Sequence, residues 1–132
     1  MPITAFYAAL LAPLFILLAV RVIRRRRGAR VAIGDGGDKL LLRRMRVHAN
    51  FAEYAPFALV LMGLAESLGA HRWLLHAAGA ALVAARIVHA VGVSQAKENF
   101  RLRISGMAGT LTVIGVLALA CVVMSARAGF GL

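Results

Sequence analysis

The chain has 132 residues, of which 61% are hydrophobic, and its mean hydropathy is +0.81. A soluble domain of this size cannot bury so much apolar surface, so lipid must cover much of it. The formal net charge is +11, but the charges lie in short clusters between apolar runs and no nucleic-acid-binding motif is present, so we expect no nucleic-acid partner.

The first apolar run extends from Ile3 to Ile23, and the basic run Arg24 to Arg27 follows it. No positive side chain precedes the apolar run, which is the order of a retained membrane anchor and not of a cleaved signal peptide. The next segment, Gly28 to Gly37, has the composition of a loop. Asp38 is placed to cap a helix that begins near Lys39.

Three further helices are predicted after this loop. The second is basic in its first turns and apolar from Phe57 to Ala65, and the fourth apolar run, Ile104 to Ala126, has no charged residue. Because a spanning helix needs about 20 residues, four spans use nearly the whole chain. We predict an all-α fold, a membrane four-helix bundle in a single domain over residues 1–132, with helices at about 3–24, 39–68, 72–94 and 102–127.

The links between the predicted helices differ in charge. The first link holds Arg24 to Arg27 and Arg30, and the third leads into Arg101 and Arg103, whereas the second has only Arg72. Positive residues are enriched in cytoplasmic loops. We therefore expect the first and third links in the cytoplasm and both termini on the opposite side.

Three polar residues on the second helix, Arg46, Asn50 and Glu53, are spaced four and three apart. This spacing places them on one helix face. A carboxylate inside a membrane helix is costly unless it is paired or hydrated, so we expect Glu53 to be shielded from lipid and paired with an arginine. Two interpretations stay open at this point: a buried polar cluster that holds helices together, or a ligand site.

Two further groups of charged residues lie in the second half of the chain. Arg86 and His89 are three apart in the third helix and share a face, and an arginine so deep in an apolar run must meet an anion or water. Arg101 and Arg103 open the fourth helix. Arginines at that depth commonly extend to lipid headgroups, which is the simplest interpretation of Arg101.

Together these motifs resemble a known family. Arg-x-x-x-Asn-x-x-Glu-Tyr-x-Pro from Arg46 to Pro56 is similar to the second-helix signature of MAPEG proteins (membrane-associated proteins in eicosanoid and glutathione metabolism). Arg86-x-x-His89-x-x-Gly92 resembles their third-helix motif, and Arg103-x-x-Gly106 resembles the start of the fourth helix in bacterial members. The order, the spacing and the four-span plan match over nearly the whole chain.

The resemblance implies a homotrimer with glutathione bound between neighbouring subunits, near the cytoplasmic face. By motif position, the residues that line this site are Arg46, Asn50, Glu53, Arg86 and His89, joined by Arg24 or Arg25 from the end of the first helix. The family's catalytic arginine falls on Arg103 or, as the second choice, on Arg101. No metal site is expected.

Two positions depart from the eicosanoid-forming members of the family. Several of these have a tyrosine where this chain has Val93, and one subfamily has an arginine where this chain has Ala49. We therefore predict a bacterial inner-membrane, glutathione-dependent transferase or peroxidase that acts on lipophilic electrophiles or lipid hydroperoxides. Two other classes stay open: a non-catalytic lipid- or ligand-binding membrane protein of the same fold, and a membrane protein whose polar cluster only fixes helix packing.

Overall fold

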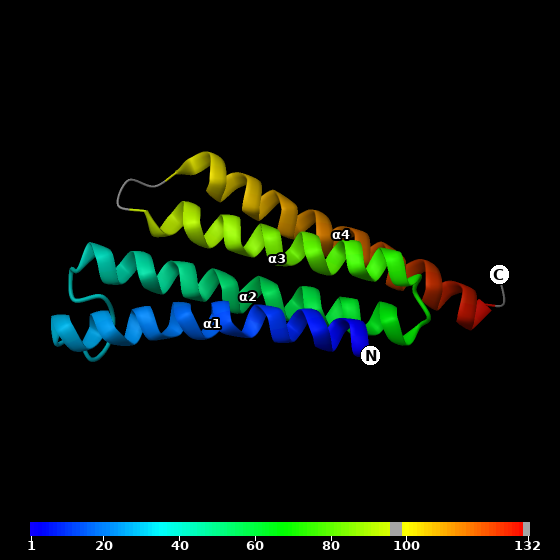
Figure 1. Cartoon of the computed structure of the whole chain (residues 1–132), viewed down its shortest axis with the longest axis horizontal. Coiled ribbons are helices and arrows are strands. Elements are labelled where there is room, and N and C mark those ends of the chain that lie inside the picture. Colours follow the sequence, from blue (N-terminus) through cyan, green and yellow to red (C-terminus); the bar gives the residue numbers. More distant parts are fainter. Residues whose placement is uncertain (96–98, 131–132) are drawn as a thin grey trace.

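The computed structural model describes residues 1–95 and 99–130, and these form four long helices in chain order (Figure 1). The helices are α1 (Pro2–Ala29), α2 (Lys39–Ser67), α3 (Arg72–Ser94) and α4 (Phe100–Phe130). Within the described residues there is no strand. The predicted all-α four-helix bundle is confirmed.

The first helix is longer than the sequence indicated, because it continues through the arginine run to Ala29. Arginine is a good helix former, and cations near a helix C-terminus interact favourably with the helix dipole. The helix ends where Arg30 adopts a left-handed conformation with φ 55° and its N–H bonds back to the carbonyls of Arg26 and Arg27.

The start of α2 is fixed by Asp38. Its carboxylate accepts hydrogen bonds from the backbone N–H of Leu40 at 2.9 Å and of Leu41 at 3.0 Å, as an N-cap residue does. The guanidinium of Arg25 pairs with the same carboxylate at 2.7 Å and ties the end of α1 to the start of α2. The hydrogen bond from Leu41, assisted by Arg25, lowers the pKa of Asp38 below its usual 3.8.

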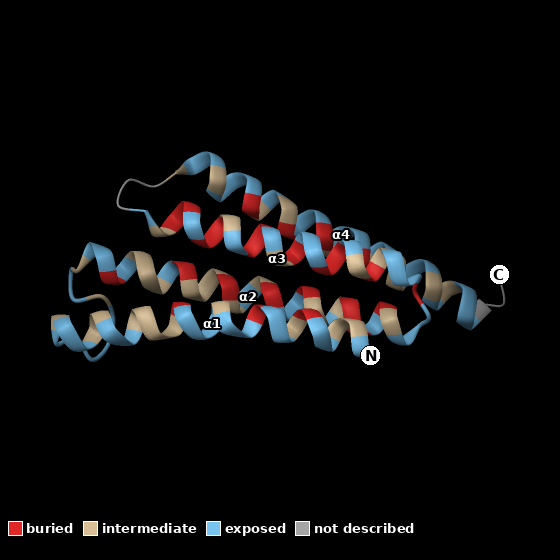
Figure 2. Ribbon diagram, viewed as in Figure 1, coloured by how far each residue is buried: buried red, intermediate tan, exposed pale blue. Residues whose placement is uncertain are grey.

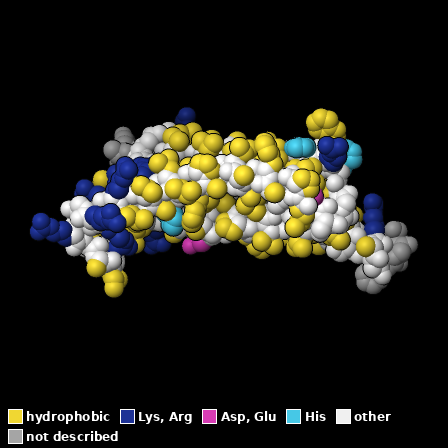
Figure 3. Space-filling view, turned by 60° about the horizontal axis from the view of Figure 1, so that its bottom comes forward, with side chains coloured by type: hydrophobic (Ala, Val, Ile, Leu, Met, Phe, Trp, Pro, Cys, Tyr) yellow, Lys and Arg dark blue, Asp and Glu magenta, His cyan; other side chains and the backbone are white. Residues whose placement is uncertain are grey.

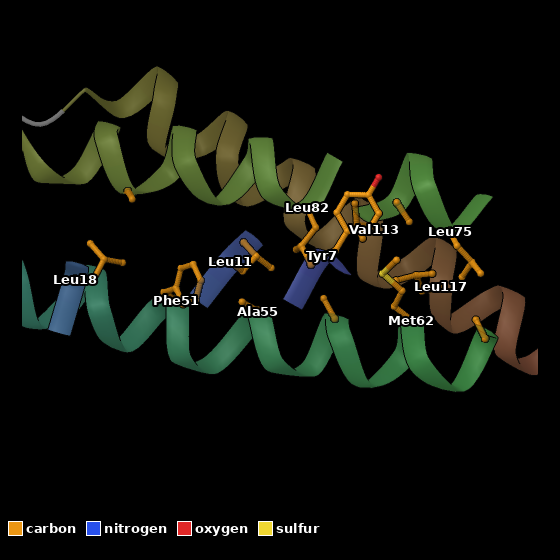
Figure 4. Packing of buried hydrophobic residues seen from close by; sticks show 14 of the residues in the cluster. Tyr7, Leu11, Leu18, Phe51, Ala55, Met62, Leu75, Leu82, Val113 and Leu117 are labelled. Carbon is orange, nitrogen blue, oxygen red and sulfur yellow. The ribbon is translucent and has the colours of Figure 1, made fainter. Parts of the chain in front are cut away.

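The helices pack with α2 and α3 in the centre. Helix α1 packs against α2 and α3, and α4 packs against α3 and α2, whereas the backbones of α1 and α4 are not neighbours within the described part of the chain. Buried residues follow the inner faces of α2 and α3 (Figure 2). Side chains from all four helices meet in the core, among them Leu11, Met62, Leu82 and Leu117 (Figure 4).

The outside of the bundle is apolar along its length. Large hydrophobic side chains on α1 and α4 are exposed, and basic side chains gather at one end of the molecule (Figure 3). Of the helices in the described residues, α1, α3 and residues 100–129 of α4 are long and apolar enough to cross a membrane. Helix α2 does not reach this level by composition, because its first turns are basic and its later turns still contain the polar residues Asn50, Glu53 and Glu66. The chain is an integral membrane protein.

The ends of the helices are sorted between the two ends of the bundle. The loop between α1 and α2 lies at the same end as the C-terminus of α3 and the N-terminus of α4 (Figure 1). The start of α1 and the end of α4 lie at the other end. The basic loop end and the terminal end are therefore separated by the full length of the bundle.

Candidate functional site

A cavity of about 560 Å³ is lined by residues of α2, α3 and α4. Small-molecule sites usually have volumes of about 300–1,000 Å³. The cavity adjoins the first half of α2 and the start of α4, so it lies toward the basic end of the bundle. The lining residues are Lys39, Leu42, Arg43, Arg46, Ala49, Asn50, Glu53, His89, Val93 and Arg103.

One face of α2 supplies most of the cavity wall. Its lining residues repeat every three or four positions from Lys39 to Glu53, which is the period of a single helix face. The spacing of Arg46, Asn50 and Glu53 therefore predicted their shared orientation. Lys39 and Arg43 also line the cavity, although they were not predicted as site residues. They precede Arg46 by seven and three residues, so the same helical period would have placed both on this face.

The lining is strongly cationic. Among the described residues, Lys39, Arg43, Arg46 and Arg103 line the cavity together with one carboxylate, that of Glu53. Basic groups in a partly enclosed site favour an anionic ligand, and arginine binds carboxylates through two parallel hydrogen bonds. The cavity is therefore suited to a molecule with more than one negative group.

Glu53 is exposed in the single chain, where it lines the same cavity as Arg46. Among the described residues, no ion pair involves Glu53. The expectation that an arginine pairs with it stays a prediction, and its partner would come from outside the single chain or from a change of side-chain conformation.

Arg86 was expected to line the site, whereas the structure places it behind the cavity wall with 0% of its surface exposed. Its guanidinium donates hydrogen bonds to Asn50 Oδ1 at 2.7 Å, to His89 Nδ1 at 3.1 Å and to Thr110 Oγ1 at 3.4 Å. It also lies 5.6 Å from the centre of the Phe51 ring, a cation–π contact. Residues three apart on a helix differ in direction by about 60°, which is enough to turn Arg86 into the core while His89 reaches the cavity.

The contact with Arg86 determines how His89 presents its ring. A guanidinium only donates, so Nδ1 of His89 must accept and carries no proton. In the neutral ring the proton is then on Nε2, which makes His89 a hydrogen-bond donor through that nitrogen. Arg86 therefore orients two cavity residues, Asn50 and His89, without lining the cavity itself.

The remaining predicted site residues lie away from the cavity of the single chain. Arg101 and Arg24 are exposed and do not line it, and Arg25 is engaged by Asp38. Of the two arginines that open α4, only Arg103 faces the cavity.

Two further polar residues, which no sequence motif indicated, organise the bundle. Thr110 is fully buried and links Arg86 to the backbone of α4, because its hydroxyl donates to the Gly106 carbonyl at 2.9 Å. Glu66, at the end of α2, accepts hydrogen bonds from the backbone N–H of Ile3 at 2.9 Å and of Thr4 at 2.8 Å. It thereby caps the first turn of α1 from another helix. Sequence patterns for helix caps consider only neighbouring residues, so they could not predict this contact.

Comparison with known proteins agrees with this architecture. The sequence model of the MAPEG family matches residues 4–123. Inner membrane protein YecN of Escherichia coli strain K12 is 40% identical over 118 residues, which cover 89% of this chain and 88% of that protein. The protein of the same name in Escherichia coli O6:H1 strain CFT073 matches with the same identity and coverage.

Proposed function

Since this chain belongs to the MAPEG family, we propose that it binds glutathione in the cavity between α2, α3 and α4 and uses the thiol against lipophilic electrophiles or lipid hydroperoxides. The observation that supports this most directly is the charge that the described residues give the cavity: four cationic side chains and one carboxylate. Glutathione has the complementary set, two carboxylates and one ammonium group.

The lining residues fit these groups by their chemistry. Arg43 and Arg46 hold the carboxylates, because a guanidinium binds a carboxylate through two parallel hydrogen bonds. Glu53 takes the ammonium group, and the amide of Asn50, which both donates and accepts, bonds to the peptide groups. Arg86 keeps Asn50 and His89 oriented from behind.

We propose that Arg103 acts on the thiol. It lines the cavity from the start of α4, whereas Arg43 and Arg46 line it from α2. A nearby cation stabilises a thiolate more than a thiol and so lowers the thiol pKa. When bound, glutathione supplies the nucleophilic sulfur. With an electrophile, the sulfur forms a carbon–sulfur bond as the leaving group departs. With a hydroperoxide, two glutathione molecules form glutathione disulfide and reduce the hydroperoxide to an alcohol and water.

We further propose that the active unit is a homotrimer in the bacterial inner membrane, with the basic end of the bundle in the cytoplasm. The exposed Glu53 and the open cavity of the single chain support a neighbouring subunit as the missing wall. Arg24 of that neighbour is the better candidate to complete the site, because Arg25 is already paired with Asp38.

The test is a glutathione titration by calorimetry on the purified protein, together with a conjugation assay that uses a generic aromatic halide. Arg46→Ala should weaken glutathione binding about tenfold or more, since a lost charge-assisted pair is worth about 1.5–3 kcal/mol. The matched control is Arg101→Ala, which removes the same charge outside the cavity. A parent protein that binds no glutathione would contradict the proposal. Tight retention of an acyl lipid in its place would favour the non-catalytic lipid-binding alternative.

A further inference from the structure

Helices α3 and α4 approach each other closely at two glycines, where no side chain separates the backbones. A Cβ atom added to Gly92 of α3 would lie 2.7 Å from the backbone nitrogen of Arg103. A Cβ added to Gly106 of α4 would lie 2.5 Å from the backbone nitrogen of His89. Real Cβ atoms essentially never come so near to other atoms, so a side chain at either position would require the facing backbone to move.

The two contacts are reciprocal. Gly92, three residues after His89, packs against Arg103, and Gly106, three residues after Arg103, packs against His89. Three helical residues span about 4.5 Å along the axis, so both contacts fall within about one turn of the crossing. His89 and Arg103 both line the cavity, and each has its backbone held by the glycine of the other helix.

Hydrogen bonds hold both sides of this crossing. On one side, the backbone N–H of Asn99 donates to the carbonyl of Gly92 at 3.0 Å, and the side-chain oxygen of Asn99 accepts from Leu102 N–H at 3.2 Å. On the other side, the hydroxyl of Thr110 in α4 accepts a hydrogen bond from Arg86 of α3 at 3.4 Å and donates to the carbonyl of Gly106 at 2.9 Å. The backbones that carry Arg103 and His89 are therefore restrained by hydrogen bonds as well as by packing.

We propose that Gly92 and Gly106 are positioning residues that set the separation of His89 and Arg103 across the cavity. The effect of this positioning on catalysis rests on the proposed function, because it depends on the distance between the Arg103 guanidinium and the thiol of bound glutathione. The Coulomb interaction weakens as charges separate, and it weakens further as water enters between them. A side chain at either glycine pushes the two helices apart and moves both groups.

The experiment compares three glycine-to-alanine variants. Gly92→Ala and Gly106→Ala insert a methyl group into the crossing, whereas Gly115→Ala makes the same change on α4 where nothing lies within 4 Å of the added atom. The thiolate absorbance of bound glutathione is titrated with pH in each variant. Gly92→Ala and Gly106→Ala should reduce the thiolate fraction at neutral pH about tenfold, a shift of about one pKa unit, with glutathione affinity unchanged within a few-fold. Gly115→Ala should match the parent.

A second measurement needs no ligand. In protein labelled with ¹⁵N-histidine and ¹⁵N-arginine, the His89 ring signals and the Arg103 Nε signal are assigned by substituting each residue. Both should shift in the two crossing variants and stay in place in Gly115→Ala. If the parent binds no glutathione, the proposed function fails, and the nuclear magnetic resonance signals still decide this inference.

If Gly92→Ala or Gly106→Ala does not fold, a milder substitution still tests the proposal. Asn99→Ala removes the side-chain bond that caps α4 without adding an atom, and it should shift the Arg103 signal in the same direction by a smaller amount. Signals of His89 and Arg103 that stay at their parent positions in the folded variants would overturn the proposal. A thiolate titration in Gly92→Ala and Gly106→Ala that equals that of Gly115→Ala would do the same.

Discussion

Replacing Arg103 by alanine removes the one cation that lines the cavity from α4. A unit cation about 4 Å from a thiolate stabilises it by about 1 kcal/mol in water and by about 4 kcal/mol at an effective dielectric constant of about 20. Since one pKa unit corresponds to about 1.4 kcal/mol, the loss of Arg103 should raise the pKa of a bound thiol by about one to three units. Arg103 is exposed at the cavity wall, so we expect the lower part of this range.

A shift of one unit lowers the thiolate fraction at neutral pH about tenfold, and turnover should fall in proportion. Glutathione affinity should change only a few-fold, because the carboxylate-binding arginines of α2 remain. Two quantities are measured: the thiolate absorbance as a function of pH and the rate of conjugation. Arg101→Ala is the control, because it removes an equal charge two residues away and outside the cavity. An Arg103→Ala variant with the parent's titration and turnover would refute the reasoning, and the simple interpretation of a headgroup contact would then hold.

Three further results are expected. Arg86→Met should lower glutathione affinity about tenfold, because Asn50 and His89 lose the donor that orients them. The melting temperature should change little, because the loss of donors to buried acceptors, about 1–3 kcal/mol each, is offset by the removal of a buried cation. A large drop in melting temperature with unchanged affinity would contradict this. Single cysteines at Ile33 and Ser67, in a background without the native cysteine, should be labelled from opposite sides of the membrane, and labelling from the same side would refute the topology. Asp38→Ala should melt below the parent at neutral pH, and the gap should close as the pH falls below about 4. The folded pKa of Asp38 lies below its unfolded value, so the stabilisation is present above the unfolded pKa and is lost as the pH falls through the folded one; a gap that persists in acid would contradict this.

The fold followed from the sequence because lipid imposes a simple rule. Backbone polar groups in a bilayer must bond within a helix, so each long apolar run predicted one element. The helix ends were less predictable. The arginines after Ile23 marked the edge of the apolar run, but arginine remains a good helix former outside lipid, and α1 therefore continues to Ala29.

The candidate site was predictable where a single helix supplies the residues. The spacing of Arg46, Asn50 and Glu53 is enough to place them on one face, and all three line the cavity. Periodicity does not say how deep a residue lies within that face, which is why Arg86 was assigned to the wall and lies behind it. The distinction depends on the partners that α2 and α4 supply, and these are set by packing.

The contact between Glu66 and the start of α1 bears on the order in which the chain enters the membrane. Glu66 follows Ile3 by 63 residues, so α1 is synthesised well before its cap exists. Until then, the N–H groups of Ile3 and Thr4 must stay hydrated, which holds the start of α1 at the membrane surface. When α2 crosses, its last turn delivers the carboxylate to these groups. Helix α2, which carries the capping Glu66, thereby becomes necessary for anchoring α1, and we expect the two to settle in the bilayer as a hairpin and not one after the other.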